Sequence, residues 1–343
     1  MTILWFGIYN PDFGRNKIYM KALRDAGHTV LECQDTSSGI LKYIRLWQKH
    51  ARLEGKYDVL VVGYPGHIIT PLARFISKRK VVVDMLGSLY DAEVHSHRPS
   101  LFRRIKSRIA DYLALSYSDV VLLETEAQKK YFTERFGSSD RYRVVYTGVD
   151  ALLERPIAPE PGTSCLVVFR GKLTPECGIL YILKAAEILK PEQRVKFRII
   201  GSGYLLSEAQ AFIRERELSN VELISERLND EDFVRLVHEG DIMLGQFERN
   251  SRLDRTIPHK AFEAFASSIV YITANVPAIR EVVEEGKTGF LVPLADEHAL
   301  ADKISSLYHQ PTLRYQVARE AYRQYTERFS GPVIAQRLLK IML

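Results

Sequence analysis

The sequence predicts an α/β protein built from two doubly wound domains that face each other across a cleft. Short β-rich runs alternate with amphipathic helical stretches, and this alternation occurs twice along the chain. The length of 343 residues suits about two domains at roughly 150 residues each. Three prolines and a glycine in 150–162 indicate a linker, which we place at 151–163.

The first domain is expected at 1–150, where apolar strands are buried on both faces. That pattern is typical of a mostly parallel sheet covered by helices. The predicted strands are 2–8, 28–32, 57–63, 80–84, 119–123 and 142–146. The predicted helices are 15–26, 40–54, 67–77, 100–116 and 126–136.

The second domain is expected at 164–325, followed by a C-terminal helix at 326–343. The predicted strands are 164–169, 195–200, 221–224, 241–244, 269–272 and 289–292. The predicted helices are 178–189, 204–217, 230–238, 258–267 and 277–284, and further helices follow the last strand to the C-terminus. Ligands of such sheets bind outside the carboxyl ends of the strands, so we expect the active site in the cleft between the domains.

The composition is that of an ordinary globular protein, with 46% hydrophobic and 26% charged residues. It excludes a disordered or fibrous chain. No apolar run approaches the 18 or more residues of a membrane span, and no basic region precedes the apolar residues 2–8, so a signal peptide is not expected. Cys33, Cys165 and Cys177 have no metal-ligand spacing. We therefore expect a cytoplasmic protein in a reducing compartment.

The net charge of +6 is concentrated in the first half of the chain. Residues 1–150 hold 23 Lys and Arg against 16 Asp and Glu, and the remainder holds 25 against 26. A basic half can serve nucleic acid, an acidic membrane surface or a phosphorylated substrate. The chain has no zinc spacing, no RNA-binding aromatic signature and no compact basic helix-turn-helix, so no nucleic-acid partner is expected.

Glycines and cations follow two of the predicted strands. Residues 7–14 end in Gly14 at the start of a helix, where backbone N–H groups can meet an anion, although a plain turn would look the same. Residues 170–178 place Arg170 and Lys172 between a strand and a helix, which suits a diphosphate or a solvated basic loop.

Two further strand ends carry candidate residues. Residues 200–203 (Ile-Gly-Ser-Gly) contain Gly201, in a turn too short for the dinucleotide fingerprint. Pro258 is well placed at the first position of a helix that contains Glu263 in an otherwise apolar segment. A carboxylate in such surroundings needs a partner, unless it lies on the solvent side of the helix.

Taken in order, these segments resemble the retaining glycosyltransferases of family 4, which have the two-domain GT-B architecture. The matching segments are 144–150, 171–178, 200–203, 263–281 and 285–293. Each motif is weak alone, but their shared order over about 150 residues indicates two Rossmann-like domains. The resemblance also implies that the C-terminal helix packs back on the first domain.

The resemblance implies transfer of a sugar from a nucleotide-sugar donor with retention at the anomeric carbon, without a metal or other cofactor. The acceptor would be a glycan, a lipid-linked molecule or a small molecule. The second domain would hold the donor and the first the acceptor. Glu263 would bind the ribose hydroxyls, Lys172 the diphosphate, and Gly14 would meet the sugar phosphate from the other domain.

The chemistry fits these roles. The breaking bond leaves a diphosphate with growing negative charge, which preordered cations and backbone N–H groups stabilise. We therefore add Arg170, Gly201, Arg255, His259 and Lys260 to the expected donor-binding residues, with Lys172 also catalytic. The amides of His259 and Lys260 follow Pro258 at a helix end.

Several residues depart from the family pattern. Arg255 stands where the family has its first Glu, Lys172 replaces an Arg, and Cys177 replaces a Lys. Lys260 could supply the cation that Cys177 lacks, or Arg255 or Arg170 could do so. These departures leave an alternative function open, a catalytically degraded nucleotide-binding protein that regulates an active glycosyltransferase.

In the first domain the family's usual His after the fourth strand is absent. Asp84 and Asp91 lie there instead, and we expect them to contact acceptor hydroxyls as catalytic residues, unless they are cap or turn residues.

A basic stretch at 98–108 predicts a contact with an anionic membrane surface. It holds five cations and no acid, and apolar residues occur at helical spacing opposite some of them. Arg103, Arg104 and Arg108 are the expected membrane contacts, which would place the protein peripherally on the inner face of a membrane. A solvated helix face over a domain core is the alternative.

Overall fold

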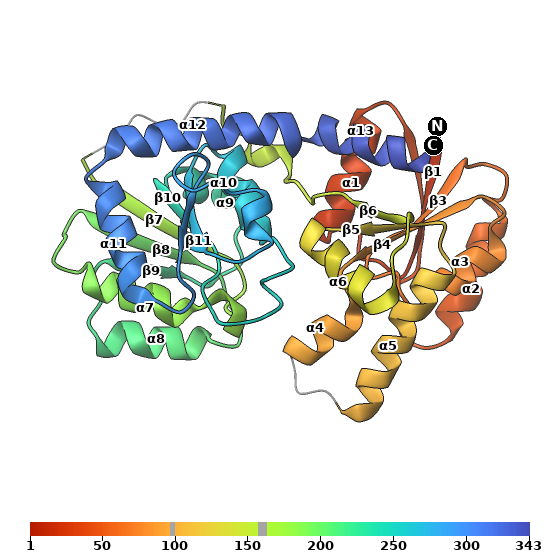
Figure 1. Cartoon of the computed structure of the whole chain (residues 1–343), viewed down its shortest axis with the longest axis horizontal. Coiled ribbons are helices and arrows are strands. Elements are labelled where there is room, and N and C mark those ends of the chain that lie inside the picture. Colours follow the sequence, from red (N-terminus) through yellow and green to blue (C-terminus); the bar gives the residue numbers. More distant parts are fainter. Residues whose placement is uncertain (97–99, 157–162) are drawn as a thin grey trace. The chain divides into compact units, whose positions relative to one another are not determined.

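The chain forms two compact units in a computed structural model that describes residues 1–96, 100–156 and 163–343. Unit 1 comprises Met1–Asp150 and Phe329–Leu343, and unit 2 comprises Ala151–Arg328 (Figure 1). The part of the predicted linker at 157–162 and the cation Arg98 lie outside the described residues. No helix in the described part of the chain has the length and apolar character that crossing a membrane requires.

Unit 1 contains a six-stranded sheet in which every described pairing is parallel, in the order β2-β1-β3-β4-β5-β6. Its strands are β1 (Thr2–Gly7), β2 (Thr29–Gln34), β3 (Val59–Val62), β4 (Lys80–Leu86), β5 (Val120–Leu123) and β6 (Tyr142–Val144). The central strands are runs such as Val-Leu-Val-Val that are buried on both faces, as helices on both sides require.

Helices cover both faces of this sheet (Figure 1). They are α1 (Gly14–Asp25), α2 (Leu41–Ala51), α3 (Thr70–Ile76), α4 (Leu89–Ser96), α5 (Leu101–Ser116), α6 (Glu126–Phe136) and α13 (Gly331–Met342). Buried residues of α1 and α13 share one core with the sheet, and those of α2, α3, α5 and α6 share the core on the other face. The end of the chain therefore completes the core of unit 1.

Unit 2 has a second six-stranded parallel sheet, in the order β12-β11-β10-β7-β8-β9. Its strands are β7 (Cys165–Arg170), β8 (Val195–Ile200), β9 (Val221–Ile224), β10 (Ile242–Leu244), β11 (Val270–Ala274) and β12 (Phe290–Val292). Its α-helices are α7 (Ile179–Ile188), α8 (Leu206–Glu215), α9 (Asp230–His238), α10 (His259–Ala266), α11 (Glu297–Tyr308) and α12 (Pro311–Arg328). Short 3₁₀ turns occur at Ala151–Leu153, Pro175–Cys177 and Ile279–Glu281.

The predicted fold class, two doubly wound α/β domains, is confirmed by the two sheets. Two elements differ from the sequence predictions. The segment expected as a helix at 277–284 forms only the 3₁₀ turn Ile279–Glu281, because the chain turns there into β12. Helix α4 was not predicted; its first turn is capped by Asp111 of α5, which accepts hydrogen bonds from the backbone N–H groups of Leu89 and Tyr90.

Candidate functional site

The strand order of unit 2 places its candidate site at the carboxyl end of β7. Strands β8 and β9 extend the sheet on one side of β7, and β10, β11 and β12 extend it on the other. Connections that leave β7 and β10 therefore diverge to opposite faces and open a crevice outside the strand ends. The loops that border this point begin at Gly171, after β7, and at Gly245, after β10.

Two glycine loops pack backbone to backbone beside this point. The N–H of Gly171 donates to Ile200 O at 2.9 Å, and the N–H of Leu173 donates to Ser202 O at 3.0 Å. A Cβ at Gly201 would lie 1.9 Å from Gly171 O, and the φ of Gly201 is +155°, so a side chain cannot be accommodated there. The glycine turn that the sequence singles out thus sets the position of the Gly171 loop.

Helix α10 carries Glu263 into the same region, where the carboxylate finds the partners that its burial requires. Arg170 donates from Nε to Oε2, and its Nη2 forms an ion pair with Oε1. His259, one turn earlier on α10, places Nδ1 3.0 Å from Oε1. The solvent-facing alternative for Glu263 is therefore wrong, because the side chain is only 2% exposed.

These contacts limit what Glu263 can still accept. A carboxylate offers about four lone-pair positions. Arg170 and His259 use three of them, two on Oε1 and one on Oε2. Glu263 can therefore accept one further hydrogen bond, on Oε2, without losing a partner.

Lys260 lies under the loop that follows β7. Its Nζ is 4.0 Å from the centre of the Phe169 ring and 3.4 Å from Gly245 O, and a Cβ at Gly171 would lie 3.4 Å from it. The side chain is buried, and this burial, together with the nearby Arg170, lowers the pKa of Lys260 to about 7. An ammonium group thus lies at the divergence of the β7 and β10 connections with one long hydrogen bond to the backbone.

A pocket of about 410 Å³ adjoins this cluster at the carboxyl ends of β8 and β9. Its lining residues are Ile200, Gly201, Ser202, Ser225, Glu226, Arg227, Leu228, Asp230 and Phe233. The guanidinium of Arg170 lies 5.3 Å from the centre of the Phe233 ring, so the Arg170–Glu263 pair forms the link between the pocket and α10. The pocket therefore lies beside a hydrogen-bond acceptor, the Glu263 carboxylate, and near a buried cation, Lys260.

The other predicted cations of unit 2 are less buried than Lys260; they are Lys172 and Arg255. Lys172 is exposed on the Gly171 loop, and Arg255 is half-buried in the turn before Ile257. The structure thus brings Arg170, Gly201, His259, Lys260 and Glu263 together, with Lys172 on the adjoining loop.

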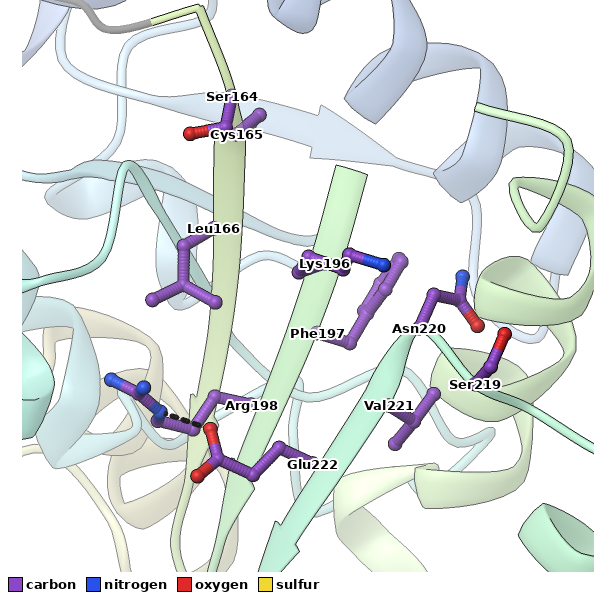
Figure 2. A pocket seen from close by; sticks show the side chains of 10 residues that line it. All are labelled: Ser164, Cys165, Leu166, Lys196, Phe197, Arg198, Ser219, Asn220, Val221 and Glu222. Atoms are coloured by element: carbon purple, nitrogen blue, oxygen red, sulfur yellow. Dashed lines mark hydrogen bonds and ion pairs between the residues drawn. The ribbon is translucent and has the colours of Figure 1, made fainter. Parts of the chain in front are cut away.

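A second pocket, of about 400 Å³, opens at the opposite ends of β7, β8 and β9 (Figure 2). Two of its charged lining residues, Arg198 and Glu222, are already paired with each other at 2.7 Å, as Figure 2 shows. Amino ends of parallel strands rarely carry the ligand site. We therefore place the candidate site at the carboxyl ends.

In unit 1, Asp84 lies at the end of β4 and is fully buried. Both carboxylate oxygens are 2.9 Å from Nε of Arg15, and Nη1 of Arg15 donates to Val145 O and Thr147 Oγ1. The expectation that Asp84 contacts an acceptor hydroxyl is corrected by this geometry, because the carboxylate is enclosed and holds Arg15. Its role is to fix Arg15 and, with it, the start of α1.

Gly14 and Asp91 occupy helix starts in unit 1. Gly14 is the first residue of α1, beside the buried Arg15. Asp91 is buried in the first turn of α4, where its N–H donates to Ser88 Oγ at 3.0 Å. A carboxylate at that position is favoured by the helix dipole, and its contact with an acceptor stays a prediction.

The three predicted membrane contacts are exposed on α5. Arg103 pairs with Glu93 at 3.2 Å, and Arg104 donates to the Tyr90 hydroxyl at 3.1 Å. The guanidinium of Arg108 lies 4.9 Å from the centre of the Tyr90 ring. Arg104 and Arg108 therefore both contact one tyrosine of α4, and Arg103 contacts a glutamate of the same helix.

Sequence reasoning missed Arg15 and His67. Arg15 directly follows Gly14, but nothing local indicates that it reaches Asp84, 69 residues away. His67 is buried after β3, and its Nε2 lies 2.9 Å from Gly87 O in the loop after β4. His67, in the connection that follows β3, thus contacts the loop that follows β4. This contact arises because β3 and β4 are neighbours in the sheet, which sequence alone does not show.

In the described part of the chain, no three His, Cys, Asp or Glu residues converge as metal ligands. Residues 152–324 match the model of the family described as glycosyl transferases group 1. That match covers most of unit 2, including every residue of the site described above.

Known proteins resemble the chain along nearly its full length. The capsular polysaccharide biosynthesis glycosyltransferase CapM of Staphylococcus aureus is 32% identical over 319 residues, which cover 87% of this chain and 78% of CapM. An uncharacterized glycosyltransferase of Methanocaldococcus jannaschii is 23% identical over 365 residues, covering 96% and 94%.

Among solved structures, Anabaena HepE in complex with UDP-glucose has a TM-score of 0.77 at 18% identity, covering 99% of this chain and 98% of HepE. Sucrose-phosphate synthase of Thermosynechococcus elongatus has a TM-score of 0.76 at 14% identity, covering 99% and 97%. At these identities the likeness shows the shared fold.

Proposed function

The chain belongs to the glycosyl transferases group 1 family, and from this membership we propose that it moves a sugar from a nucleoside diphosphate sugar to an acceptor. The proposed reaction retains the anomeric configuration and needs no metal. The observation that carries the proposal is the cluster at the carboxyl end of β7, where a buried lysine adjoins two glycine loops and a partnered glutamate.

The donor's diphosphate would lie at the Gly171 loop. Lys260 lies beneath that loop and close to Cys177, whose thiol stands where the resemblance expects a lysine. Lys260 can therefore supply the missing cation, joined by the exposed Lys172 and by the N–H groups at the start of α10. As the glycosidic bond breaks, these groups would stabilise the charge that grows on the leaving diphosphate.

The donor's nucleoside would occupy the pocket beside Phe233. A ribose hydroxyl would donate to the remaining lone pair of Glu263 Oε2 while Arg170 and His259 keep their contacts with the carboxylate. Structures of HepE hold UDP-glucose and UDP. UDP is therefore the first nucleotide to test on this chain.

The acceptor would be held by unit 1. CapM and the putative WcaL of Escherichia coli are named as glycosyltransferases of capsular polysaccharide and colanic acid biosynthesis. Their names support a growing polysaccharide as the acceptor class, and a lipid-linked molecule is the further acceptor that the family resemblance implies. Asp91 remains the proposed polar contact on that side.

A second candidate function is motivated by Arg255 and Cys177, which replace a family Glu and Lys. In that case the chain would bind nucleotide and regulate an active glycosyltransferase. The position of Lys260 favours the enzyme, because a cation remains where the substitution at 177 removes one.

Transfer assays separate these two functions. We expect the full chain to release nucleoside diphosphate from one member of a UDP-, GDP- and ADP-sugar panel when lipid and glycan acceptors are supplied. Proton NMR of the product should show the donor's anomeric configuration, and EDTA should leave the rate unchanged. Nucleotide binding without release from any donor would instead support the regulatory protein.

A further inference from the structure

Helices α2, α3 and α5 of unit 1 expose an unusual amount of apolar surface. All three cover the same face of the sheet, and α3 contacts both of the others. Among the described residues, eleven large apolar side chains on these helices and the loops that enter them are more than a third exposed, against three in the whole of unit 2. We call this surface the α2–α3–α5 face. Monomeric surfaces rarely gather apolar side chains in this way without a partner.

Helix α5 extends past the body of unit 1, with α4 beside it (Figure 1). Its first six residues, 101–106, are all exposed. Leu101 and Phe102 are 71% and 76% exposed at the tip, and Ile105 follows one turn later. An apolar helix tip that reaches no core is suited to insertion between other apolar groups.

Helix α2 also exposes apolar side chains. Leu41, Ile44 and Trp47 lie at helical spacing on its outer side, while Leu46 faces the core. Trp47 is 55% exposed, and the other tryptophan of the chain, Trp5, is fully buried. On α3, Phe75 is 87% exposed. The apolar surface therefore spans three consecutive helices of the layer.

The α2–α3–α5 face is basic overall, and three of its arginines, Arg45, Arg74 and Arg103, pair with Asp35, Asp119 and Glu93 at its edges. Helices α2, α3 and α5 together contain eight Lys and Arg residues and a single acidic residue, Asp111, which is buried as the cap of α4. A second copy of this face would bring like charges together, which disfavours self-association. Cations that flank exposed apolar side chains match anionic lipid headgroups above an acyl region.

We infer that the α2–α3–α5 face docks on a lipid bilayer that contains anionic lipid, with side chains of both α2 and α5 entering the interface. Helices that follow parallel strands begin at the carboxyl edge of the sheet, so Leu41, Ile44, Leu101 and Phe102 lie toward that edge. This edge is where unit 1 would hold its acceptor. Docking of this face would therefore bring a lipid-linked acceptor to the carboxyl edge of the sheet. This consequence rests on the proposed function, whereas docking itself does not.

The test uses the full chain with vesicles of phosphatidylcholine alone or with 30% phosphatidylglycerol, and needs no donor or acceptor. We expect cosedimentation with the anionic vesicles and at least tenfold weaker binding to the neutral ones. Lipids brominated in the acyl chains should quench Trp47, because only this tryptophan lies on the face. Trp47→Phe, which leaves only the buried Trp5, should remove the quenching and keep the binding.

Matched variants separate the apolar and the charged contributions. Leu41→Ser/Ile44→Ser and Leu101→Ser/Phe102→Ser should each weaken binding at least tenfold. The control Ile188→Ser/Tyr204→Ser, on exposed apolar residues of unit 2, should bind as wild type does. Arg104→Glu/Arg108→Glu should abolish binding, and Lys129→Glu/Lys130→Glu on α6, with the same change in charge, should not.

Four results would overturn the inference. They are absence of binding to anionic vesicles, absence of Trp47 quenching, binding that the serine variants leave unchanged, and a soluble dimer that those variants convert to monomers without any vesicle binding. A protein that docks as expected but transfers no sugar would contradict only the proposed function.

Discussion

Lys260 is the residue whose surroundings least favour the charge that it carries. Its ammonium group is buried near Arg170, with an aromatic ring and one backbone carbonyl as close neighbours. Such a group gains a strong partner when a diphosphate arrives, and its protonated form is then stabilised. The cost of burying this cation is therefore lowest when donor is bound.

The pKa of Lys260, lowered to about 7, makes this coupling measurable. At pH 8 most of the free protein should lack this proton, so binding of UDP should take up protons, approaching one per nucleotide. Calorimetry in buffers with different ionisation enthalpies measures this number. Lys260→Met should take up none, and Lys184→Met, which changes a half-buried lysine of α7 that pairs with Glu297, should behave as wild type does. Equal uptake by wild type and Lys260→Met would exclude the role of Lys260.

The lowered pKa of Lys260 also makes the free energy of unfolding depend on pH. Lys260 has a lower pKa in the folded chain than in the unfolded chain, so between about pH 7 and 10.5 the unfolded state binds more protons. The free energy of unfolding of wild type should therefore rise across this window relative to that of Lys260→Met. The difference is read from urea unfolding curves at pH 7 and pH 10.

Glu263 combines a structural and a binding role. Replacement by Gln keeps the volume but removes the charge that Arg170 and His259 share. A hydrogen bond to a charged group contributes about 1.5–3 kcal/mol, so nucleotide affinity should fall roughly tenfold or more. The double variant with Arg170→Met shows whether the two effects are coupled. A Glu263→Gln protein with wild-type affinity would assign Glu263 to structure alone.

At the scale of elements, the site depends on the close packing of the β7 and β8 loops. Gly201→Ala should cost about 2–6 kcal/mol, because it adds a collision with Gly171 O to an unfavourable φ. Gly39→Ala is the matched control: its φ is +83°, but no atom lies within 4 Å of the added Cβ, so only about 1–2 kcal/mol is expected. Urea unfolding measures both, and equal losses would show that the loop contact contributes nothing.

Elements were predictable from sequence where the pattern is local. Strands such as Val59–Val62 are predictable because they consist of apolar, mostly β-branched residues. The start of α10 is predicted to within one residue by Pro258. Helix α4 is not predicted because its cap, Asp111, lies in the next helix, α5. The outward apolar stripe of α2 is not among the sequence predictions, because sequence alone does not distinguish an outward stripe from a core-facing one.

At the scale of the whole molecule, the sequence predicted two sheets of the doubly wound class and the candidate residues around β7. It could not predict which of them meet, because the meeting depends on strand order. Arg170 and Glu263 are 93 residues apart, and they pair only because β7 and α10 lie at the same end of one sheet. Asp84 was expected to be accessible to an acceptor, but it is buried against Arg15, which lies 69 residues away in the sequence.

The central claim is that nucleotide binds at the carboxyl ends of β7, β8 and β10 in unit 2. Hydrogen–deuterium exchange of the full chain with and without UDP, or with whichever of GDP and ADP raises its Tm most, tests this claim directly. The account predicts slower exchange in peptides that span 170–179, 200–206 and 256–264, with a smaller effect in Lys260→Met. Protection confined to unit 1, or to 164–166, 196–198 and 219–222 around the pocket of Figure 2, would contradict it.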